Sequence, residues 1–248
     1  MKTVVSKALC AFAIFAAGLL PSAQAGTISG GSALLTPTGH AQLETWLGQG
    51  QFNLNNVFTL QPGLDADDFH GAADGVGRTF ALMLVGDGVN QWLVGGYNPQ
   101  SWDSLNHWHE TPDDKDRVAF VFNMTSGSVF RQIPSSYILP SQGEKQTFNS
   151  ELHGPAFGEG GDLWVTGDLQ HAYSWLFSYG DPAMQGLSLI DGAIPEPLPA
   201  MMTLHAMEIF TIAAIPEPSS AAMMIAGMLV LASVLSRRRK HPVNSANV

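Results

Sequence analysis

The pattern His107-Trp108-His109-Glu110 comes closest to a metal site in this 248-residue chain. Residues two apart share one face of a β-strand, so His107 and His109 could bind one zinc ion together, with Glu110, His70 or His153 as a third ligand. Pro112 and a polar run follow, however, and these favour a solvated loop. We therefore keep zinc binding as an alternative and expect no cofactor.

Hydrolase chemistry would need a nucleophile with a base, or two carboxylates. The sequence has no Gly-x-Ser-x-Gly elbow, and its single cysteine, Cys10, lies in an N-terminal apolar run. Glu159 and Asp162 could act as a glycosidase pair only at the right separation in space. Serines could act only if the fold brings them to a histidine; the candidates are Ser101, Ser104 and Ser174 with His70, His153 or His171. We expect a non-catalytic domain, and a metal- or carboxylate-dependent hydrolase of surface polysaccharide is the alternative.

The glycine-rich stretch from Gly154 to Gly161 is typical of tight turns rather than of a phosphate site. A phosphate-binding loop would be followed by a helix and a nearby basic residue. Here Asp162 and the apolar residues after it begin a strand instead. We therefore expect Phe157 to be a buried anchor within this loop.

Aromatic residues offer many stacking surfaces in an acidic domain, which is a pattern used in carbohydrate recognition. We expect Trp164 and Tyr97, at strand positions, to lie in the core. We expect Trp108 and Trp175, in polar or variable stretches, to be exposed.

The elements that would position these residues are mostly short strands. One helix is expected from Thr36, with Thr38 as its cap and Gly48 at its end, and another from Asp65, with Asp68 completing an imperfect capping box. Five apolar runs bounded by turn residues are expected to be strands: Thr79–Val85, Gln91–Tyr97, Val118–Met124, Leu163–Thr166 and Met207–Ile212. This pattern favours a mainly β, α+β fold.

Both ends of the chain carry apolar runs that predict export. Residues 1–25 have two lysines, a thirteen-residue apolar run and a small-residue site for signal peptidase. Residues 219–236 are long enough to span a bilayer as a helix, and the basic cluster that follows should stay cytoplasmic together with residues 241–248.

The charge of the intervening part excludes one class of partner. Five basic and twenty acidic residues lie between Gly26 and Ala214, giving a formal net charge of −15. Such a surface repels phosphate backbones, so nucleic acid binding is not expected.

The C-terminal pattern of Pro216-Glu217-Pro218, an apolar run and then Arg237, Arg238 and Arg239 resembles the PEP-CTERM sorting signal, here over residues 215–240. The resemblance implies that an exosortase cleaves near Pro216-Glu217-Pro218. It also implies delivery to the cell surface or an exopolysaccharide matrix, with the helix anchoring the chain until cleavage. A second copy, Pro195-Glu196-Pro197, lacks the uncharged run and the basic residues after it.

Several motifs between them resemble the TLDc domain, over residues 35–213 after a linker at 26–34. They are Phe69-His70-x-x-x-Asp74-x-x-Gly77-x-Thr79, Gly95-Gly96-Tyr97 with Ser101-Trp102, Ala119-Phe120-Val121-Phe122, Gly154-Pro155-x-Phe157-Gly158-x-Gly160-x-Asp162-Leu163 and Met207-Glu208-Ile209-Phe210. The resemblance implies two packed antiparallel sheets, a β-sandwich, flanked by a few short helices. We expect a binding or structural role associated with exopolysaccharide, and an envelope protein-interaction module is a further alternative.

Overall fold

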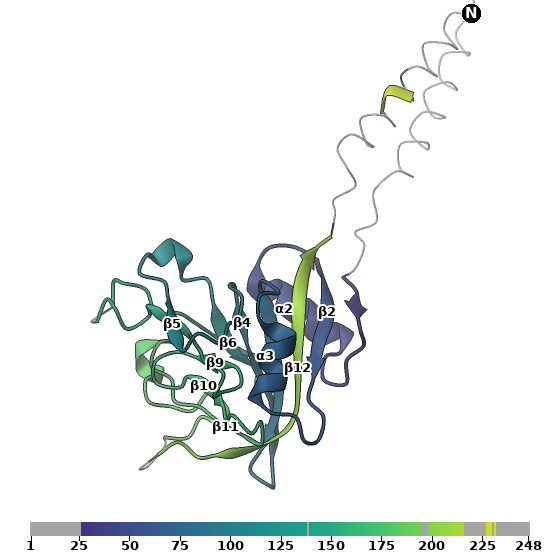
Figure 1. The fold of residues 1–248 in the computed structure, drawn as a ribbon. Helices are drawn as coiled ribbons and strands as arrows, with labels where there is room; N and C mark the ends of the chain where they lie inside the picture. Colours follow the sequence, from purple (N-terminus) through teal and green to yellow (C-terminus); the bar gives the residue numbers. More distant parts are fainter. Residues whose placement is uncertain (1–25, 138, 195–197, 216–226, 230, 232–248) are drawn as a thin grey trace, which may run out of the picture. The chain divides into compact units, whose positions relative to one another are not determined.

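A computed structural model describes residues 26–137, 139–194, 198–215, 227–229 and 231 (Figure 1). The predicted signal at 1–25, the sorting residues Pro216, Glu217, Pro218, Arg237, Arg238 and Arg239, and the tail at 241–248 lie outside these residues. Of the predicted span at 219–236, only residues 227–229 and 231 are described, and they are helical. Within the described residues, no helix is long and apolar enough to cross a membrane.

The two α-helices begin at side-chain caps. Helix α2 (Pro37–Leu47) is capped by Thr36, whose hydroxyl accepts from the Gly39 N–H at 3.1 Å, and it ends at Gly48 with φ 68°. The cap predicted at Thr38 is therefore wrong by two residues, because Pro37 fits the first helical position. Helix α3 (Ala66–Ala73) has the predicted capping box between Asp65 and Asp68. Residues 26–215 as described also contain two short 3-10 helices, η1 (Asp114–Asp116) and η2 (Pro182–Met184).

The domain is mainly β, as predicted, and its strands form one twelve-stranded sheet. All five predicted strands exist, with small differences in their ends except that the last begins five residues earlier. The strands are β1 (Ile28–Ser29), β2 (Phe52–Thr59), β3 (Thr79–Gly86), β4 (Gln91–Asn98), β5 (His107–Glu110), β6 (Phe120–Asn123), β7 (Ser128–Arg131), β8 (Lys145–Asn149), β9 (Ala156–Phe157), β10 (Leu163–Val165), β11 (His171–Tyr173) and β12 (Met202–Ala214).

The prediction of two separate sheets is wrong because β12 joins them. Along one edge β12 pairs with β3 over most of its length, from Thr203 to Thr211. Along the other edge it pairs first with β11, at Met202 and Thr203, and then with β2, from Glu208 to Ala214. The hydrogen-bonded order β5-β8-β9-β10-β11-β12-β3-β4-β6-β7 is therefore continuous. Every strand pair is antiparallel except β1 with β2.

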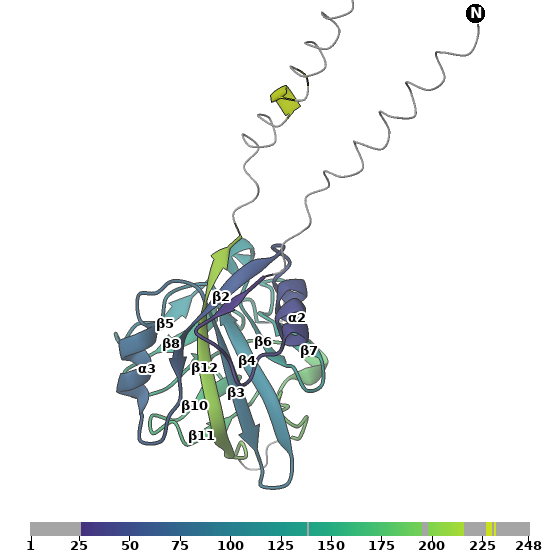
Figure 2. The same cartoon turned by 90° about the vertical axis from the view of Figure 1, so that its right-hand side faces the viewer.

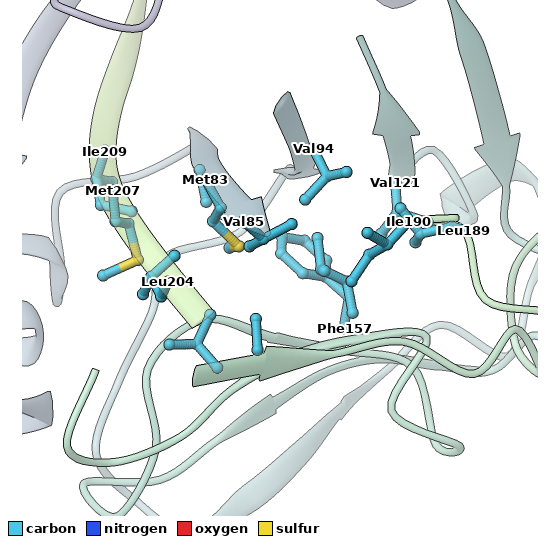
Figure 3. Packing of buried hydrophobic residues seen from close by; sticks show 14 of the residues in the cluster. Met83, Val85, Val94, Val121, Phe157, Leu189, Ile190, Leu204, Met207 and Ile209 are labelled. Carbon is cyan, nitrogen blue, oxygen red and sulfur yellow. The ribbon is translucent and has the colours of Figure 1, made fainter. Parts of the chain in front are cut away.

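The continuous sheet folds back so that distant strands face each other across the main core (Figure 3). Phe157 of β9 packs with Met83 of β3, Val94 of β4 and Val121 of β6 in one buried cluster. Helix α3 adds Phe69 to this cluster. The predicted burial of Phe157 is confirmed, since its side chain is 0% exposed.

A second core lies on the other face of β3. It joins Leu43 and Trp46 of α2 to Phe80, Phe122 and Phe210 of the sheet. Because both faces of β3 are covered, its sequence is a nearly unbroken apolar run rather than an alternating one. Figure 2 accordingly shows α2 and α3 on opposite sides of the long strands β12, β3 and β4.

The segment predicted to be a linker, 26–34, belongs to the domain instead. Ile28 pairs with Leu54 of β2, and Leu54 pairs on its other side with Ile212 of β12. The buried carboxylate of Glu208 accepts hydrogen bonds from the Ser32 hydroxyl and the Ala33 N–H. The two ends of the compact unit Gly26–Ala214 therefore flank the same strand (Figure 2).

Candidate functional site

The residues that carry the family resemblance contact one another as structural supports. The Trp102 indole N–H donates to the Thr79 hydroxyl at 2.9 Å, and both residues are buried. The Gly77 N–H donates to the Ser101 hydroxyl at 2.8 Å. These contacts tie the start of β3 to the segment that follows β4, so Ser101 serves the turn rather than a reaction.

His70 is a buried tie between α3 and the loop after β8. Its Nδ1 lies 2.7 Å from Asp74 Oδ1, and its Nε2 lies 2.8 Å from the Ser150 carbonyl and 3.1 Å from the His153 carbonyl. The Ser104 hydroxyl donates to Asp74 Oδ2 at 2.7 Å. Ser104, Asp74 and His70 are thus connected by hydrogen bonds, but Asp74 lies between the serine and the histidine. Because Nε2 faces only carbonyl acceptors, it cannot take a proton from a serine.

His107 and His109 lie in strand β5, so the predicted loop is wrong. The strand forms because Trp108 pairs with Phe148 of β8, a partner far away in sequence. His107 Nε2 lies 3.0 Å from Asp103 Oδ2. Burial and the nearby His107 lower the pKa of His109 below its ordinary value.

The strand does not assemble the predicted zinc site. Glu110 follows an irregularity in the pairing of β5 with β8, and His70 is engaged by the contacts described above. Among the described residues, no three His, Cys, Asp or Glu side chains lie close enough together to hold a metal ion. Among these residues, His107 and His109 therefore gain no third ligand from Glu110, His70 or His153.

Glu159 and Asp162 occupy different environments and do not face a common cleft. Asp162 is fully buried, and its carboxylate accepts the backbone N–H groups of Phe177, Ser178 and Tyr179 at 2.7, 3.1 and 2.8 Å. Burial raises the pKa of Asp162 to about 7 against these three donors. Glu159 instead forms an ion pair with Lys145 near the surface. Asp162 therefore organises a loop, and it is not open to a sugar.

No model of a known protein family matches this chain, and no curated protein matches it.

Four aromatic side chains form a line across strands β5, β8, β9, β10 and β11, which are consecutive at one end of the sheet. We call Trp108, Phe148, Trp164 and Tyr173 the aromatic row. The ring centroids of Trp108 and Phe148 are 4.8 Å apart, those of Phe148 and Trp164 are 5.5 Å apart, and those of Trp164 and Tyr173 are 6.2 Å apart. The last two pairs are stacked, with interplanar angles of 21° and 15°. Each member comes from a different strand.

Strand alternation places the aromatic row on the face away from the core. Leu163 and Val165, on either side of Trp164, belong to the main core, and so does Ala172 beside Tyr173. Successive side chains of a strand point to opposite faces, so the row faces outward. All four rings are half-buried. The face therefore presents partly accessible aromatic surface in a fixed arrangement.

Pairing register explains why the row is continuous across β9, which contributes no ring. Ala156 of β9 pairs with Trp164, and Thr147 pairs with Phe157, so Phe148 comes next to Ala156. The small Ala156 side chain leaves room for the rings of Phe148 and Trp164 to meet. Trp164 and Tyr173 are direct cross-strand partners.

Two polar side chains border the aromatic row. The Lys145 ammonium lies 5.3 Å from the centroid of the Trp108 ring and is ion-paired with Glu159. The His153 ring packs edge-on to Trp164 with centroids 4.7 Å apart. Burial lowers the pKa of His153, with a smaller contribution from His70. The border of the row is therefore polar with little net charge at neutral pH.

The sequence identified only part of this row. Tyr97 is buried and Trp175 is 43% exposed, as predicted. Trp164 was predicted to lie in the core, and this prediction is wrong. Its side chain is half-buried on the other face, because Leu163 and Val165 fill the core side of β10. Phe148 was missed. The signal for Trp164 was the alternation Leu-Trp-Val, which places the tryptophan opposite its two neighbours.

A separate pocket of about 410 Å³ lies where the β6–β7 turn meets the segment 184–192. Trp92 and Asp191 line it together with serine and threonine side chains. The Asn123 amide, also in its wall, donates to the carbonyls of Leu189 and Ile190. That amide is therefore committed to holding the wall, which makes the pocket a weaker binding candidate than the row.

Proposed function

We propose that this chain is an exported protein of the cell surface or extracellular matrix whose domain binds exopolysaccharide without catalysis. Export rests on the apolar N-terminal run, and sorting by an exosortase rests on Pro216-Glu217-Pro218 with the basic cluster at Arg237–Arg239. The TLDc resemblance adds a mainly β domain between these signals. The chain is anchored in the membrane by its C-terminal helix only until cleavage.

The aromatic row carries the binding half of this proposal. Sugar rings have apolar C–H faces, and aromatic side chains bind them by burying that surface while nearby polar groups fix their orientation. The row offers four rings in register, and Lys145, which is paired with Glu159, and His153 lie at its border.

The absence of catalysis is supported by the roles of the candidate groups. His70 and Asp74 join α3 to neighbouring segments, and Asp162 holds a loop by three backbone N–H groups. Ser174 donates to the Asp162 carbonyl and accepts from the Leu189 N–H. Each of these side chains is therefore used in the fold itself.

Fluorescence titration of the full chain in detergent with the exopolysaccharide of the producing cells tests the binding. We expect saturable quenching or enhancement of tryptophan emission, because two of the four rings are tryptophans. Trp164→Ala should weaken binding by about tenfold, the equivalent of about 1.4 kcal/mol.

Trp92→Ala is the matched control, since Trp92 is also half-buried but lines the pocket. Loss of binding in Trp92→Ala alone would move the site to the pocket. A full chain that shows no polysaccharide binding at all would overturn the binding half of the proposal.

A further inference from the structure

We infer that the aromatic row binds a neutral polysaccharide chain lying across the strands and discriminates against anionic polysaccharides. This inference rests on the proposed function and specifies its ligand. It follows from the length and direction of the row and from the charge around it.

The length of the row indicates a chain rather than a single sugar. Its members lie on β5, β8, β10 and β11, with Ala156 of β9 between them. The three separations between neighbouring ring centroids place the first and last rings at most about 17 Å apart. Four rings at this spacing can contact several successive sugars of an extended polymer.

The direction of the row follows from its register. Trp108 is the cross-strand partner of Phe148, and Trp164 is the partner of Tyr173. Cross-strand partners lie along the hydrogen-bonding direction, so the row runs perpendicular to the strands. A bound polymer would therefore lie across β5 to β11 rather than along any one strand.

The charge of the domain argues against an anionic polymer. The compact unit carries twenty acidic and five basic residues. Lys145 borders the row, but it is paired with Glu159. Arg117 and Arg131 direct their guanidinium groups to backbone carbonyls. A uronate, sulfate or phosphate polymer approaching this surface would be repelled, and the paired lysine gives it little compensation.

Binding through the row also differs from binding by charge in its response to salt. A cationic polymer could bind the acidic surface anywhere, and that attraction is screened as the Debye length falls from about 10 Å at 0.1 M to about 3 Å at 1 M salt. Contact between aromatic rings and uncharged sugars does not depend on such screening. We therefore expect the affinity for a neutral polymer to persist at high salt.

The test compares a soluble neutral β-glucan with a polyuronate of similar length, using the full chain in detergent and calorimetric titration at low and high salt. We expect the glucan to bind at both salt concentrations. Its affinity should fall about tenfold in Trp164→Ala and also in Trp108→Ala, which changes the edge strand β5 and so disturbs the core least. Trp92→Ala should bind normally.

Each of three outcomes would overturn a different part of the proposal. Equal or tighter binding of the polyuronate would overturn the neutral selectivity and leave exopolysaccharide binding standing. Glucan binding that is unchanged in both row variants would overturn the assignment of the row. Failure of the full chain to bind the glucan, the polyuronate and the exopolysaccharide of its own cells would overturn the proposed function as well.

Discussion

The ring of Phe157 lies directly against Gly96, although β9 and β4 are far apart in the order of the sheet. A Cβ built at position 96 would meet the ring carbon Cζ at 2.5 Å. The folded-back arrangement of the sheet therefore depends on a position without a side chain.

Gly96→Ala should lower the free energy of unfolding by about 1 to 3 kcal/mol, because the added methyl must displace the buried ring. Urea unfolding followed by circular dichroism measures this change. Gly71→Ala is the control, since Gly71 is exposed on α3 and a Cβ there meets nothing within 4 Å. An unchanged unfolding midpoint in Gly96→Ala would contradict the packing of β9 on β4.

Asp162 should make the domain less stable as the pH rises from about 4 to about 7. Its pKa in the folded protein is about 7, above the ordinary 3.8, so in this window the folded state binds more protons than the unfolded state. The free energy of unfolding should therefore fall with rising pH, by at most about 1.4 kcal/mol per pH unit.

Urea unfolding at several pH values, with Asp162→Asn for comparison, tests this dependence. Asparagine does not titrate, and it keeps the oxygen that accepts the Phe177 and Tyr179 N–H groups, so the variant should lack this part of the slope. Asp168→Asn is the control, because hydrogen bonds from Thr166 and Gln170 lower the pKa of Asp168 and confine its effect to acid pH. Identical slopes in Asp162→Asn and the unmodified chain would disprove the raised pKa.

Arg117 should be irreplaceable by lysine. Its side chain is 2% exposed, and its guanidinium donates to four backbone carbonyls, those of Thr111, Pro112, Ile133 and Pro140. A lysine has three donors in a different geometry and would leave buried carbonyls unpaired. We expect Arg117→Lys to cost about 3 kcal/mol or more, measured by urea unfolding. Lys115→Met, at a side chain 76% exposed, should change stability by less than about 0.5 kcal/mol.

Glu208 should hold the segment 26–34 on the domain. Its carboxylate accepts the Ala33 N–H at 2.7 Å, so Glu208→Ala should remove the protection of that amide against hydrogen exchange. Amides of β3 and β4 should keep their protection, and Glu208→Gln should retain part of the effect. Unaltered exchange at Ala33 would show that β1 alone fixes the segment.

Glu217→Ala should leave the C-terminal helix attached to the exported chain, if Pro216-Glu217-Pro218 is the sorting motif. Mass spectrometry of the chain recovered from the producing cells would show the untrimmed mass. Glu196→Ala alters the similar triplet at Pro195-Glu196-Pro197 and should be trimmed normally. Normal trimming of the Glu217 variant would refute the sorting proposal.

Local chemistry made several elements predictable from the sequence. The cap of α3 depends on Asp65 and Asp68, which are three residues apart, and the end of α2 depends on Gly48. The strands at 79–86 and 91–98 are apolar along most of their length because the main core covers one of their faces and the second core covers the other. Each of these signals depends only on residues that are close together in the sequence.

The sequence by itself determined the mainly β composition, the capping box of α3, the glycine that ends α2 and the acidic charge of the domain. Only the tertiary structure decided that β12 joins the strands into one sheet and that Trp108, Phe148, Trp164 and Tyr173 meet on one face. The physical reason is that the alternation of a strand assigns its residues to two faces without showing which face is covered. The pairing partners that decide this lie tens of residues away, on strands too short to specify their register alone.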